Sequence, residues 1–542
     1  MKKNNSPLTI RLFFLLLPLF VLVCNDQKST KYSPEIEIIP SPKEIIKDRD
    51  NGALELENTI SIFVKGEDSK KFFDLFTNDL KIIFFQNLNF KKSDNIDSDI
   101  SFNIENSLGN EEYKIEIDKN VIITGGSYNA ITMAKSSLLQ IIKLKSNKTI
   151  ILPKSKIIDE PDSSYRGLMI DLSRMWHSLE SIRNVIDLAS FYKIKYLQLH
   201  LSDDQAFAFP TDSFPNLPTP DRPYTKKDFV ELVEYAKIRG VTIIPEIDVP
   251  GHSRQFIETY PKIFDVDNGI KKSNVINIAN EEVYKALDQI IAEVVEVFYN
   301  SPFVHMGADE AKLDLYKNVK EVKSFMKKNK LGDDVHELYR YFIVRVNKIV
   351  KKYDKQMLVW EGFRKEGKIK IPKDIIVFEF ETLYNHPKNL IEDGYTLVNT
   401  SWTPLYAVYG GVKNKMARRA VWSPERIYKW NKWRWEHFSK DVPGYNPIQL
   451  NETPKVIGGQ MCSWEQSGEA EIPVLRKRLP VFSERVWNDK PKKSFEKIFS
   501  TIERTDKILS LIIKDSRQDS ILVGYNFKKD GCLWCDPNKE IE

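Results

Sequence analysis

One stretch decides the fold of this chain: Phe303-Val304-His305-Met306-Gly307-Ala308-Asp309-Glu310. An apolar run predicts a buried strand, and it ends in two adjacent carboxylates. Successive side chains of a strand point to opposite faces, but where the backbone bends into a loop two neighbouring acids can face one pocket. Two acids at the C-terminal end of a barrel strand suit general acid catalysis beside a stabilised cation. Taken alone, the pair would more simply be a solvated strand end, so the surrounding segments decide.

The segments around this stretch repeat a rhythm of strand followed by helix. One helix is indicated by a capping box at Thr225–Asp228 and a stop at Gly240. This rhythm predicts an α/β fold, a (β/α)8 TIM barrel, whose usual size of roughly 200 to over 400 residues fits. An open doubly wound sheet is the alternative, but no glycine-rich phosphate loop supports it. The predicted strands are 167–172, 196–201, 242–247, 303–307, 357–360, 375–380, 396–401 and 456–463.

A small α+β domain is expected before the barrel. Alternating residues predict strands at 36–39 and 114–117, and Gly125-Gly126-Ser127 opens a helical run. Proline and charge interrupt the pattern around Pro161, which marks a boundary. We therefore expect the small domain at 33–158, the barrel at 159–505 and a C-terminal extension at 506–542.

The first 24 residues have the pattern of an export signal. Positive charge precedes an apolar run at 12–23, which is too short to span a bilayer core of ~30 Å comfortably. The run ends at Cys24, and polar residues follow. This resembles a bacterial lipoprotein signal in which Cys24 is acylated, although Val23 stands where a small residue is usual. The sequence thus predicts a protein exported to the periplasm or cell surface, with a lipid anchor at Cys24 as its expected membrane contact.

Composition and cysteine usage exclude several other classes. Lys+Arg 81 against Asp+Glu 76 gives a net charge of +5, which makes no electrostatic case for nucleic acid. Cys462 lies in an apolar strand and is expected to be a buried hydrophobe. Cys532 and Cys535 form a lone C-x-x-C, for which a local disulfide is expected in an exported protein rather than half a metal site. No cofactor or metal is indicated, and the oligomeric state stays open.

Acidic, basic and aromatic residues follow the ends of nearly all the predicted strands. Active sites of such barrels lie at these ends. Carboxylates pair with sugar hydroxyls and rings stack on the apolar face of a sugar, so the mixture favours carbohydrate binding. The residues expected at the mouth are Asp171, Arg174, His200, Asp203, Asp204, Glu246, Asp248, His252, Asp309, Glu310, Trp360, Glu361, Glu379, Glu381, Trp402, Tyr406, Trp464, Glu465 and Gln466.

Several motifs in order resemble a known family. The chain resembles the family-20 glycoside hydrolases, the β-N-acetylhexosaminidases, over nearly its whole mature length. The segments that carry the likeness are Tyr165-Arg166-Gly167-Leu168-Met169-Ile170-Asp171-Leu172-Ser173-Arg174, His200-Leu201-Ser202-Asp203-Asp204-Gln205, Pro245-Glu246-Ile247-Asp248-Val249-Pro250-Gly251-His252, His305-Met306-Gly307-Ala308-Asp309-Glu310 and Ser483-Glu484-Arg485-Val486-Trp487.

The resemblance implies substrate-assisted retaining catalysis, an exception to the two-carboxylate scheme. The 2-acetamido oxygen of the substrate attacks C1 and forms an oxazolinium intermediate. Glu310 is implied as general acid and base, a role that calls for a raised pKa, and Asp309 as the anion that orients the acetamido group. His252, Asp203 and Asp248 are implied to support Glu310. A buried structural bond or a metal ligand set are the alternatives for the His252–Asp203 pair.

The same resemblance implies the sugar contacts. Arg174 would bind hydroxyls of the terminal sugar, or else form only a rim ion pair with Asp171. Trp360 and Trp464 would line the acetamido pocket, or else pack in the core. The substrate-binding residues implied are Arg174, His200, Trp360, Trp402, Tyr406, Trp464, Glu465 and Gln466.

The chain departs from the family pattern at several positions. Ala308 replaces the second glycine of the usual Gly-Gly-Asp-Glu, at a tight backbone position. Phe378 and Phe380 are the candidates where the family has a tryptophan after the sixth strand, and Val408 replaces the polar partner expected two residues beyond Tyr406.

Near the eighth strand, Gln466 stands where the family has glutamate, and Glu465 comes one residue early. These changes affect sugar contacts and leave the paired acids in place.

Three hypotheses follow for the function. The first is an exo-acting β-N-acetylhexosaminidase that removes terminal GlcNAc or GalNAc from glycans. The second is a surface glycan-binding protein that has lost catalysis but kept the pocket. The third is a retaining glycosidase with a protein nucleophile, whose two carboxyls would lie on separate strands about 5–5.5 Å apart. The adjacent Asp309–Glu310 pair favours the first.

Overall fold

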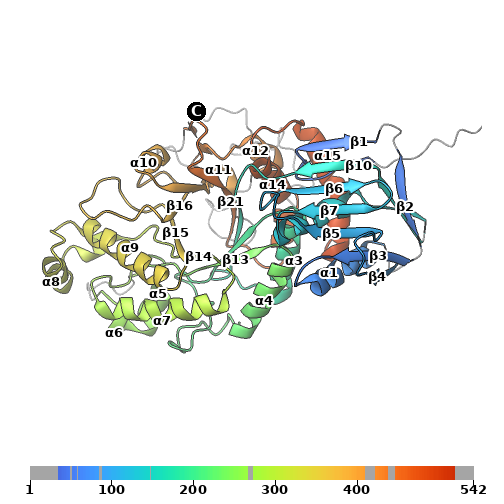
Figure 1. Ribbon diagram of the computed structural model, residues 1–542. Helices are drawn as coiled ribbons and strands as arrows, with labels where there is room; N and C mark the ends of the chain where they lie inside the picture. The colour runs from blue at the N-terminus through green and yellow to red at the C-terminus, as the bar shows by residue number, and fades with distance from the viewer. Residues whose placement is uncertain are drawn as a thin grey trace, which may run out of the picture.

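The computed structural model describes residues 35–48, 52–57, 59–84, 88–146, 148–266, 273–408, 422–436 and 446–518. These residues form a small N-terminal domain and a barrel (Figure 1). The predicted export signal, Cys24 and the Cys532–Cys535 pair lie outside the described residues. Among the helices of the described ranges, none has both the length and the apolar character needed to cross a membrane.

The barrel is a closed ring of eight parallel strands. Strand β21 pairs with β11 from Tyr165–Gly458 to Ile170–Ser463, and this pairing closes the ring. The predicted fold class is confirmed, and each predicted strand is found within two residues of its expected ends. The strands are β11 (Tyr165–Asp171), β12 (Tyr196–His200), β13 (Thr242–Glu246), β14 (Phe303–His305), β15 (Gln356–Trp360), β16 (Ile376–Glu379), β17 (Thr396–Asn399) and β21 (Val456–Trp464).

Helices surround the ring and connect its strands (Figure 1). Helix α4 begins with the predicted capping box, in which Thr225 and Asp228 exchange hydrogen bonds, and Gly240 follows it with φ +74°. The helices before β17 are α3 (Leu179–Phe191), α4 (Lys226–Ile238), α5 (Arg254–Thr259), α6 (Pro261–Phe264), α7 (Glu281–Val297), the 3-10 helix η1 (Leu313–Tyr316), α8 (Lys320–Lys328), α9 (Val335–Lys352) and α10 (Pro387–Glu392). Those after it are α11 (Trp402–Leu405), α12 (Pro424–Lys429), α13 (Glu471–Leu475), α14 (Leu479–Trp487) and α15 (Phe495–Ile512).

The seventh strand is interrupted before it reaches the mouth. Strand β17 ends at Asn399, the chain kinks between Ser401 and Leu405, and a short strand β18 (Tyr406–Val408) then pairs with the end of β21. Strand β21 therefore pairs with β17 along its first half and with β18 along its second. A small antiparallel pair, β19 (Arg434–Trp435) and β20 (Ile448–Gln449), lies outside the barrel sheet.

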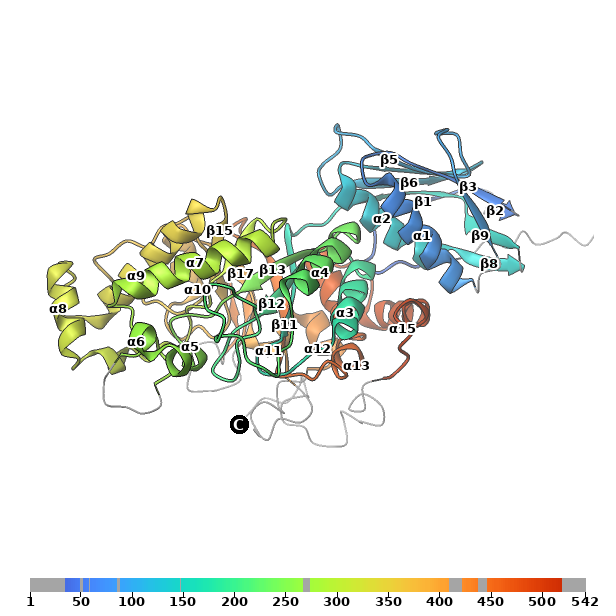
Figure 2. The ribbon, with the colours of Figure 1, turned by 90° about the horizontal axis from the view of Figure 1, so that it is seen from below.

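The small domain is an α+β unit, as predicted. Its main sheet has the strand order β1-β10-β6-β7-β5-β3-β4, and β2, β9 and β8 form a second sheet. Helices α1 (Ser69–Ile83) and α2 (Tyr128–Ile141) lie between the main sheet and the barrel (Figure 2). The strands are β1 (Glu44–Lys47), β2 (Ala53–Glu57), β3 (Thr59–Val64), β4 (Asn89–Lys92), β5 (Ile100–Ile104), β6 (Tyr113–Ile117), β7 (Val121–Gly125), β8 (Lys143–Ser146), β9 (Thr149–Pro153) and β10 (Ser155–Asp159).

The strand predicted at 36–39 is wrong. The segment is extended but joins no sheet. Ile39 instead exchanges backbone hydrogen bonds with the side chain of Gln140 on α2, at 2.8 and 2.9 Å. Pro40 and Pro42 follow directly and lack the N–H groups that a sheet ladder needs. The alternating apolar side chains are buried against helices rather than in a sheet.

The far end of the described chain is helical. Helix α15 runs from Phe495 to Ile512 and so continues through residue 505, where the sequence placed the start of an extension. Arg504 on this helix binds Glu37 of the small domain, with Nε 2.6 Å from a carboxylate oxygen. Cys462 is fully buried with a free thiol, as expected.

A buried ion pair joins the two domains. Asp159, the last residue of β10, lies 3.1 Å from the ammonium of Lys193, and both side chains are inaccessible to solvent. Asp159 also accepts hydrogen bonds from the Tyr113 hydroxyl and from Trp487 Nε1 (2.8 Å). Burial lowers the pKa of Lys193, although Asp159 opposes this. Lys193 therefore depends on Asp159 for its charge to be tolerated.

Replacing Asp159 with asparagine should lower the free energy of unfolding by about 3–5 kcal/mol, because it leaves a buried ammonium without a counter-charge. Urea unfolding monitored by fluorescence measures the change. The matched control is Glu116→Gln, which removes an exposed ion pair to Lys156 and should cost at most about 1 kcal/mol. Equal losses in the two variants would contradict the importance of the buried pair.

Candidate active site

The candidate site is a cavity of about 220 Å³ at the C-terminal mouth of the barrel. A larger hollow of about 770 Å³ lies at the opposite end, between the starts of the strands and the small domain. Two ion pairs line that hollow, Lys432–Asp489 at 2.9 Å and Lys195–Glu111 at 3.2 Å. The mouth cavity is lined by Arg174, Asp248, His252, Asp309, Glu310, Phe380, Trp402, Tyr406, Val408, Trp464 and Glu465.

A backbone turn after β14 presents the paired acids. Gly307, Ala308 and Glu310 have φ of 61°, 79° and 46°, a left-handed conformation that side chains other than hydrogen disfavour. A Cβ on Gly307 would lie 1.7 Å from Asp248 Oδ1, so glycine is required there. The turn thus aims both Asp309 and Glu310 at the cavity, as the bend predicted after the strand requires.

Two neighbouring elements hold this turn in place. The backbone N–H of Trp360 donates to Gly307 O at 2.8 Å. The hydroxyl of Tyr339, buried on α9, donates to Ala308 O. These bonds satisfy two carbonyl groups in a buried, non-repetitive segment, where an unpaired group would cost about 1–3 kcal/mol.

The two acids have different surroundings. Asp309 is 9% exposed, and burial raises its pKa to about 7, with a further contribution from the charge of Glu310. The side chain of Glu310 is 50% exposed, and its hydrogen bond with His252 lowers its pKa. The expectation that Glu310 carries the raised pKa is therefore wrong for this structure. The turn buries the first acid and leaves the second beside a cation.

His252 lies between Asp203 and the two acids. Its Nδ1 is 3.3 Å from Asp203 Oδ1, and its Nε2 is 3.4 Å from Glu310 Oε2 and 3.9 Å from Asp309 Oδ2. Burial disfavours its charged form, but Asp248 and the hydrogen bond to Asp203 raise the pKa of His252 well above its usual value. The imidazolium can then donate from both nitrogens.

Arg174 enters the cavity from the loop after β11. Its guanidinium is held by Asp203 (2.5 Å) and Asp171 (3.0 Å) and lies 5.0 Å from the ring centre of Trp464. The ion pair with Asp171 that the sequence offered as an alternative is therefore present, and the guanidinium also lines the cavity.

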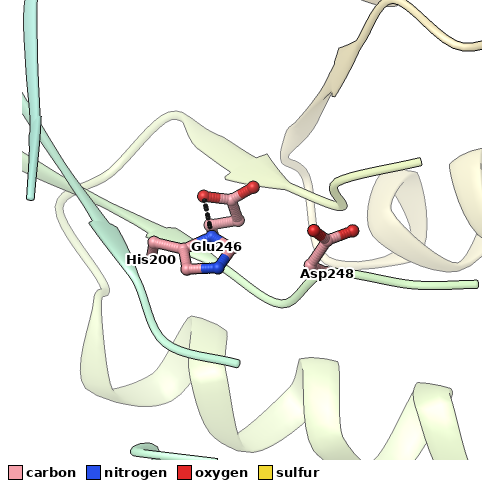
Figure 3. Close-up of side chains that lie close together, drawn as sticks. All are labelled: His200, Glu246 and Asp248. Atoms are coloured by element: carbon pink, nitrogen blue, oxygen red, sulfur yellow. Dashed lines mark hydrogen bonds and ion pairs between the residues drawn. The ribbon is translucent and has the colours of Figure 1, made fainter. Parts of the chain in front are cut away.

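His200 and Glu246 lie behind the cavity and Asp248 lies at its wall, and the three are close enough together for a metal ion to fit between them (Figure 3). His200 Nδ1 is 2.8 Å from Glu246 and its Nε2 is 3.1 Å from Asp203. Burial opposes its charge, but Glu246 and the other contacts raise the pKa of His200 well above its usual value. Both ring nitrogens therefore carry protons directed at carboxylates, which does not suit a metal ligand. The His200 imidazolium serves as a counter-charge for the buried Glu246 and Asp203.

Aromatic rings form one wall of the cavity. The kink between β17 and β18 brings Trp402 over Tyr406, with ring centres 4.6 Å apart at 30°. Tyr406 also lies 6.1 Å from Trp464, and Phe380 completes the wall. Stacked rings of this kind bind the apolar face of a sugar.

Three residues predicted for substrate contact lie behind the wall. Trp360 is 1% exposed and donates to Glu246 at 2.6 Å, and His200 packs edge-on against Trp464. Gln466 is fully buried and donates to Ala407 O. Glu465, with φ 55°, is the residue that lines the cavity at this point. The left-handed backbone at Glu465 interrupts the alternation of faces along the strand. Glu465 therefore lines the cavity, and Gln466 is buried.

From the sequence, Phe380 and Val408 are predicted only as replacements of family residues, and Glu381 is predicted at the mouth without a specific contact. Phe380 and Val408 line the cavity, and the carboxyl of Glu381 is hydrogen-bonded to that of Glu310. Their places at the ends of β16 and β18 were the available signal.

The closed barrel and its carboxylate-rich pocket place the chain among (β/α)8-barrel proteins with a site at the mouth. The catalytic-domain model of glycosyl hydrolase family 20 matches residues 164–490, and the model of domain 2 of that family matches 35–160. The chain belongs to glycosyl hydrolase family 20.

Two relatives agree with this assignment. The chain is 26% identical to beta-hexosaminidase 3 of Arabidopsis thaliana over 344 residues, covering 62% of this chain and 59% of that one. It is 27% identical to a beta-hexosaminidase of Porphyromonas gingivalis over 382 residues, covering 64% of this chain and 49% of that one. The chain thus spans about half of each of these relatives' length.

Two solved structures share the fold. A beta-N-acetylhexosaminidase from Bacteroides fragilis superposes with a TM-score of 0.75 at 20% identity, covering 89% of this chain and 97% of that one. A GH20 exo beta-N-acetylglucosaminidase from Vibrio harveyi, solved with N-acetylglucosamine, gives 0.74 at 23% identity, covering 89% and 78%.

Replacing Gly307 with alanine should lower the free energy of unfolding by at least about 2 kcal/mol, because left-handed strain adds to a collision with Asp248. The matched control is Gly332→Ala, with φ +77° and open space around the added carbon, which should cost only about 1 kcal/mol. Chemical denaturation of both variants measures the difference. Equal costs would show that the packing of Asp248 on Gly307 does not constrain the turn.

Proposed function

We propose that the chain is an exo-acting, retaining β-N-acetylhexosaminidase that hydrolyses terminal GlcNAc or GalNAc residues of glycans by substrate-assisted catalysis. One observation carries the proposal: a buried Asp309 and a half-exposed Glu310 lie side by side beside one imidazolium. The two hexosaminidase relatives support the acetamido sugar as substrate class.

The size of the cavity supports removal of a single terminal sugar. At about 220 Å³ it is smaller than the 300–1,000 Å³ of pockets that hold drug-sized ligands. Its far wall is closed by Trp402, Tyr406 and Trp464. One ring fits with its apolar face on the aromatic wall, and the remainder of the glycan points out past Glu310.

In the proposed reaction Asp309 accepts the acetamido N–H and turns the carbonyl oxygen toward C1. That oxygen forms a bond to C1 as the glycosidic C1–O bond breaks, and Glu310 gives a proton to the departing oxygen. The positive charge on the oxazolinium ring is stabilised by Asp309 in a water-poor site. Glu310 then takes a proton from water as the water oxygen bonds to C1, which restores the β configuration.

The geometry favours this scheme over a protein nucleophile. Retaining enzymes with a nucleophile place two carboxyls on either side of the bond to be cleaved. Here the same nitrogen of His252 lies within 3.4 Å of Glu310 and 3.9 Å of Asp309, so both acids approach from one side. A carboxylate buried beside the acid suits orientation of an acetamido group better than direct attack.

The Asp309→Asn variant should lower turnover of an aryl β-N-acetylglucosaminide by roughly 10²–10⁴-fold, because the developing positive charge loses its anion. Steady-state kinetics at the pH of maximal wild-type activity provide the measurement. Asp314→Asn, an exposed aspartate on η1, is the control and should keep wild-type turnover. Unchanged turnover in Asp309→Asn would contradict the substrate-assisted mechanism.

The Glu310→Gln variant should separate substrates by leaving group. An aryl glycoside whose phenol leaves readily needs little protonation and should lose far less rate than a glycan with a sugar leaving group. Comparing kcat for the two substrates in wild type and variant measures this. Equal fractional losses would show that Glu310 does not protonate the departing oxygen.

A further inference from the structure

Glu381 lies next to Glu310, at the end of β16. Its carboxyl is hydrogen-bonded to that of Glu310, and the residue is 8% exposed. The backbone around it is fixed, because Trp402 N donates to Phe380 O at 3.1 Å and the Thr382 hydroxyl donates to Glu381 O. The contact is therefore a built feature of the mouth.

A hydrogen bond between two carboxyl groups needs one proton, because two ionised carboxylates have no donor and repel each other. On its other side Glu310 faces the Nε2 of His252 at 3.4 Å. Glu310 thus accepts from two donors, one of which is Glu381. A carboxylate in this position is ionised at neutral pH and cannot by itself give up a proton.

We propose that Glu381 stores the proton that the catalytic acid delivers, so that Glu310 and Glu381 act as one general acid that shares a single proton. This inference rests on the proposed glycosidase function. The pair gives its proton through Glu310 to the departing oxygen as the C1–O bond breaks. It regains one from water as the new C1–O bond forms, so protons balance over the cycle.

The surroundings of the pair place the proton on the Glu381 side. Burial raises the pKa of Glu381 to about 8, and the charge of Glu310 adds to this. Glu381 also faces the carboxyls of Glu361 and Glu379, for both of which burial raises the pKa well above the usual value. It faces the neutral phenols of Tyr384 and Tyr406 as well.

The cationic side chains near the pair lie next to Glu310 rather than Glu381. Glu310 faces His252 and Arg174, both of which lower its pKa. Its other titratable neighbours besides Glu381 are Asp309, for which burial raises the pKa to about 7, and the phenol of Tyr384. A cation stabilises the ionised form of Glu310, and burial stabilises the neutral form of Glu381. The pKa values of these two neighbouring carboxyls are therefore shifted in opposite directions. Such a difference in pKa lets one group hold the proton while the other is ionised.

The pH dependence follows with a definite sign. As pH rises through about 8, the pair loses its last proton, so wild-type kcat/KM should fall above that pH. Glu381→Gln keeps an N–H donor to Glu310 but stores no proton, and Glu310 then titrates alone with its lowered pKa. The alkaline limb of the variant should move to lower pH.

The test is the pH profile of kcat/KM on an aryl β-N-acetylglucosaminide. Wild type and variant share the acid limb that Asp309 sets, because burial raises its pKa to about 7 and the reaction needs its anion. The compared quantity is therefore the ratio of variant to wild-type kcat/KM, which should fall at least about tenfold between about pH 5 and pH 7.5 for Glu381→Gln. The control is Glu361→Gln, which faces Glu381 but not Glu310 and should keep the wild-type profile. Glu381→Asp, which can hold a proton, should retain the alkaline activity. A Glu381→Gln profile that superposes on wild type overturns the proposal.

A second readout needs no turnover. The infrared difference spectrum between wild type and Glu381→Gln at pH 7 should show a protonated carboxyl band that disappears from wild type above about pH 9. If wild type loses no such band between about pH 7 and pH 9, the stored proton is overturned even where the variant folds poorly. The difference against Glu381→Gln separates this band from those of the other buried acids with raised pKa values. A wild-type protein that shows this band but turns over no acetamido glycoside would overturn the glycosidase function. The proton shared by Glu310 and Glu381 would then still be supported.

Discussion

The left-handed turn from Gly307 to Glu310 is the constraint on which the rest of the site depends. Gly307 packs against Asp248 with no room for a side chain, and hydrogen bonds from Trp360 and Tyr339 hold the two carbonyls that follow. Because the turn is rigid, one strand end can bury Asp309 and expose Glu310 only one residue later. Closure of the barrel between β11 and β21 then brings the loops with Arg174 and His252, and Trp464 at the end of β21, around this turn.

Charge is the second organising feature of the mouth, because acids outnumber cations in a small volume. Repulsion between them is relieved in two ways. Asp203 and Glu246 keep their charge next to Arg174, His252 and His200, whereas the buried Asp248 and Glu381 have raised pKa values and hold protons. A shift of one pKa unit corresponds to about 1.4 kcal/mol, so burial alone can set which acids are charged. The distribution gives Asp309, Glu310 and Glu381 different protonation in adjacent positions.

Much of the barrel could be predicted from the sequence, because buried parallel strands leave apolar runs and their ends carry the polar residues. The strand predicted at 36–39 failed since the same alternation also fits a segment buried between helices and stopped by Pro40. Within the site, the sequence predicts which residues lie near the mouth, but not which of them line the cavity and which lie behind its wall. Trp360 and Gln466 lie behind the cavity because local backbone turns decide which of two neighbours faces it. The pKa order of Asp309 and Glu310 was missed for the same reason, since burial of a single carboxyl depends on the turn.

The central claim is that this pocket uses the acetamido group of its own substrate. Release of nitrophenol from the aryl β-glycosides of GlcNAc, GalNAc and glucose tests it most directly. We expect cleavage of at least one acetamido glycoside and none of the glucoside. Comparable cleavage of the glucoside would contradict it and indicate a protein nucleophile. Binding of an acetamido glycan by the folded protein, with no cleavage of any substrate, would also contradict it and indicate a non-catalytic glycan-binding protein.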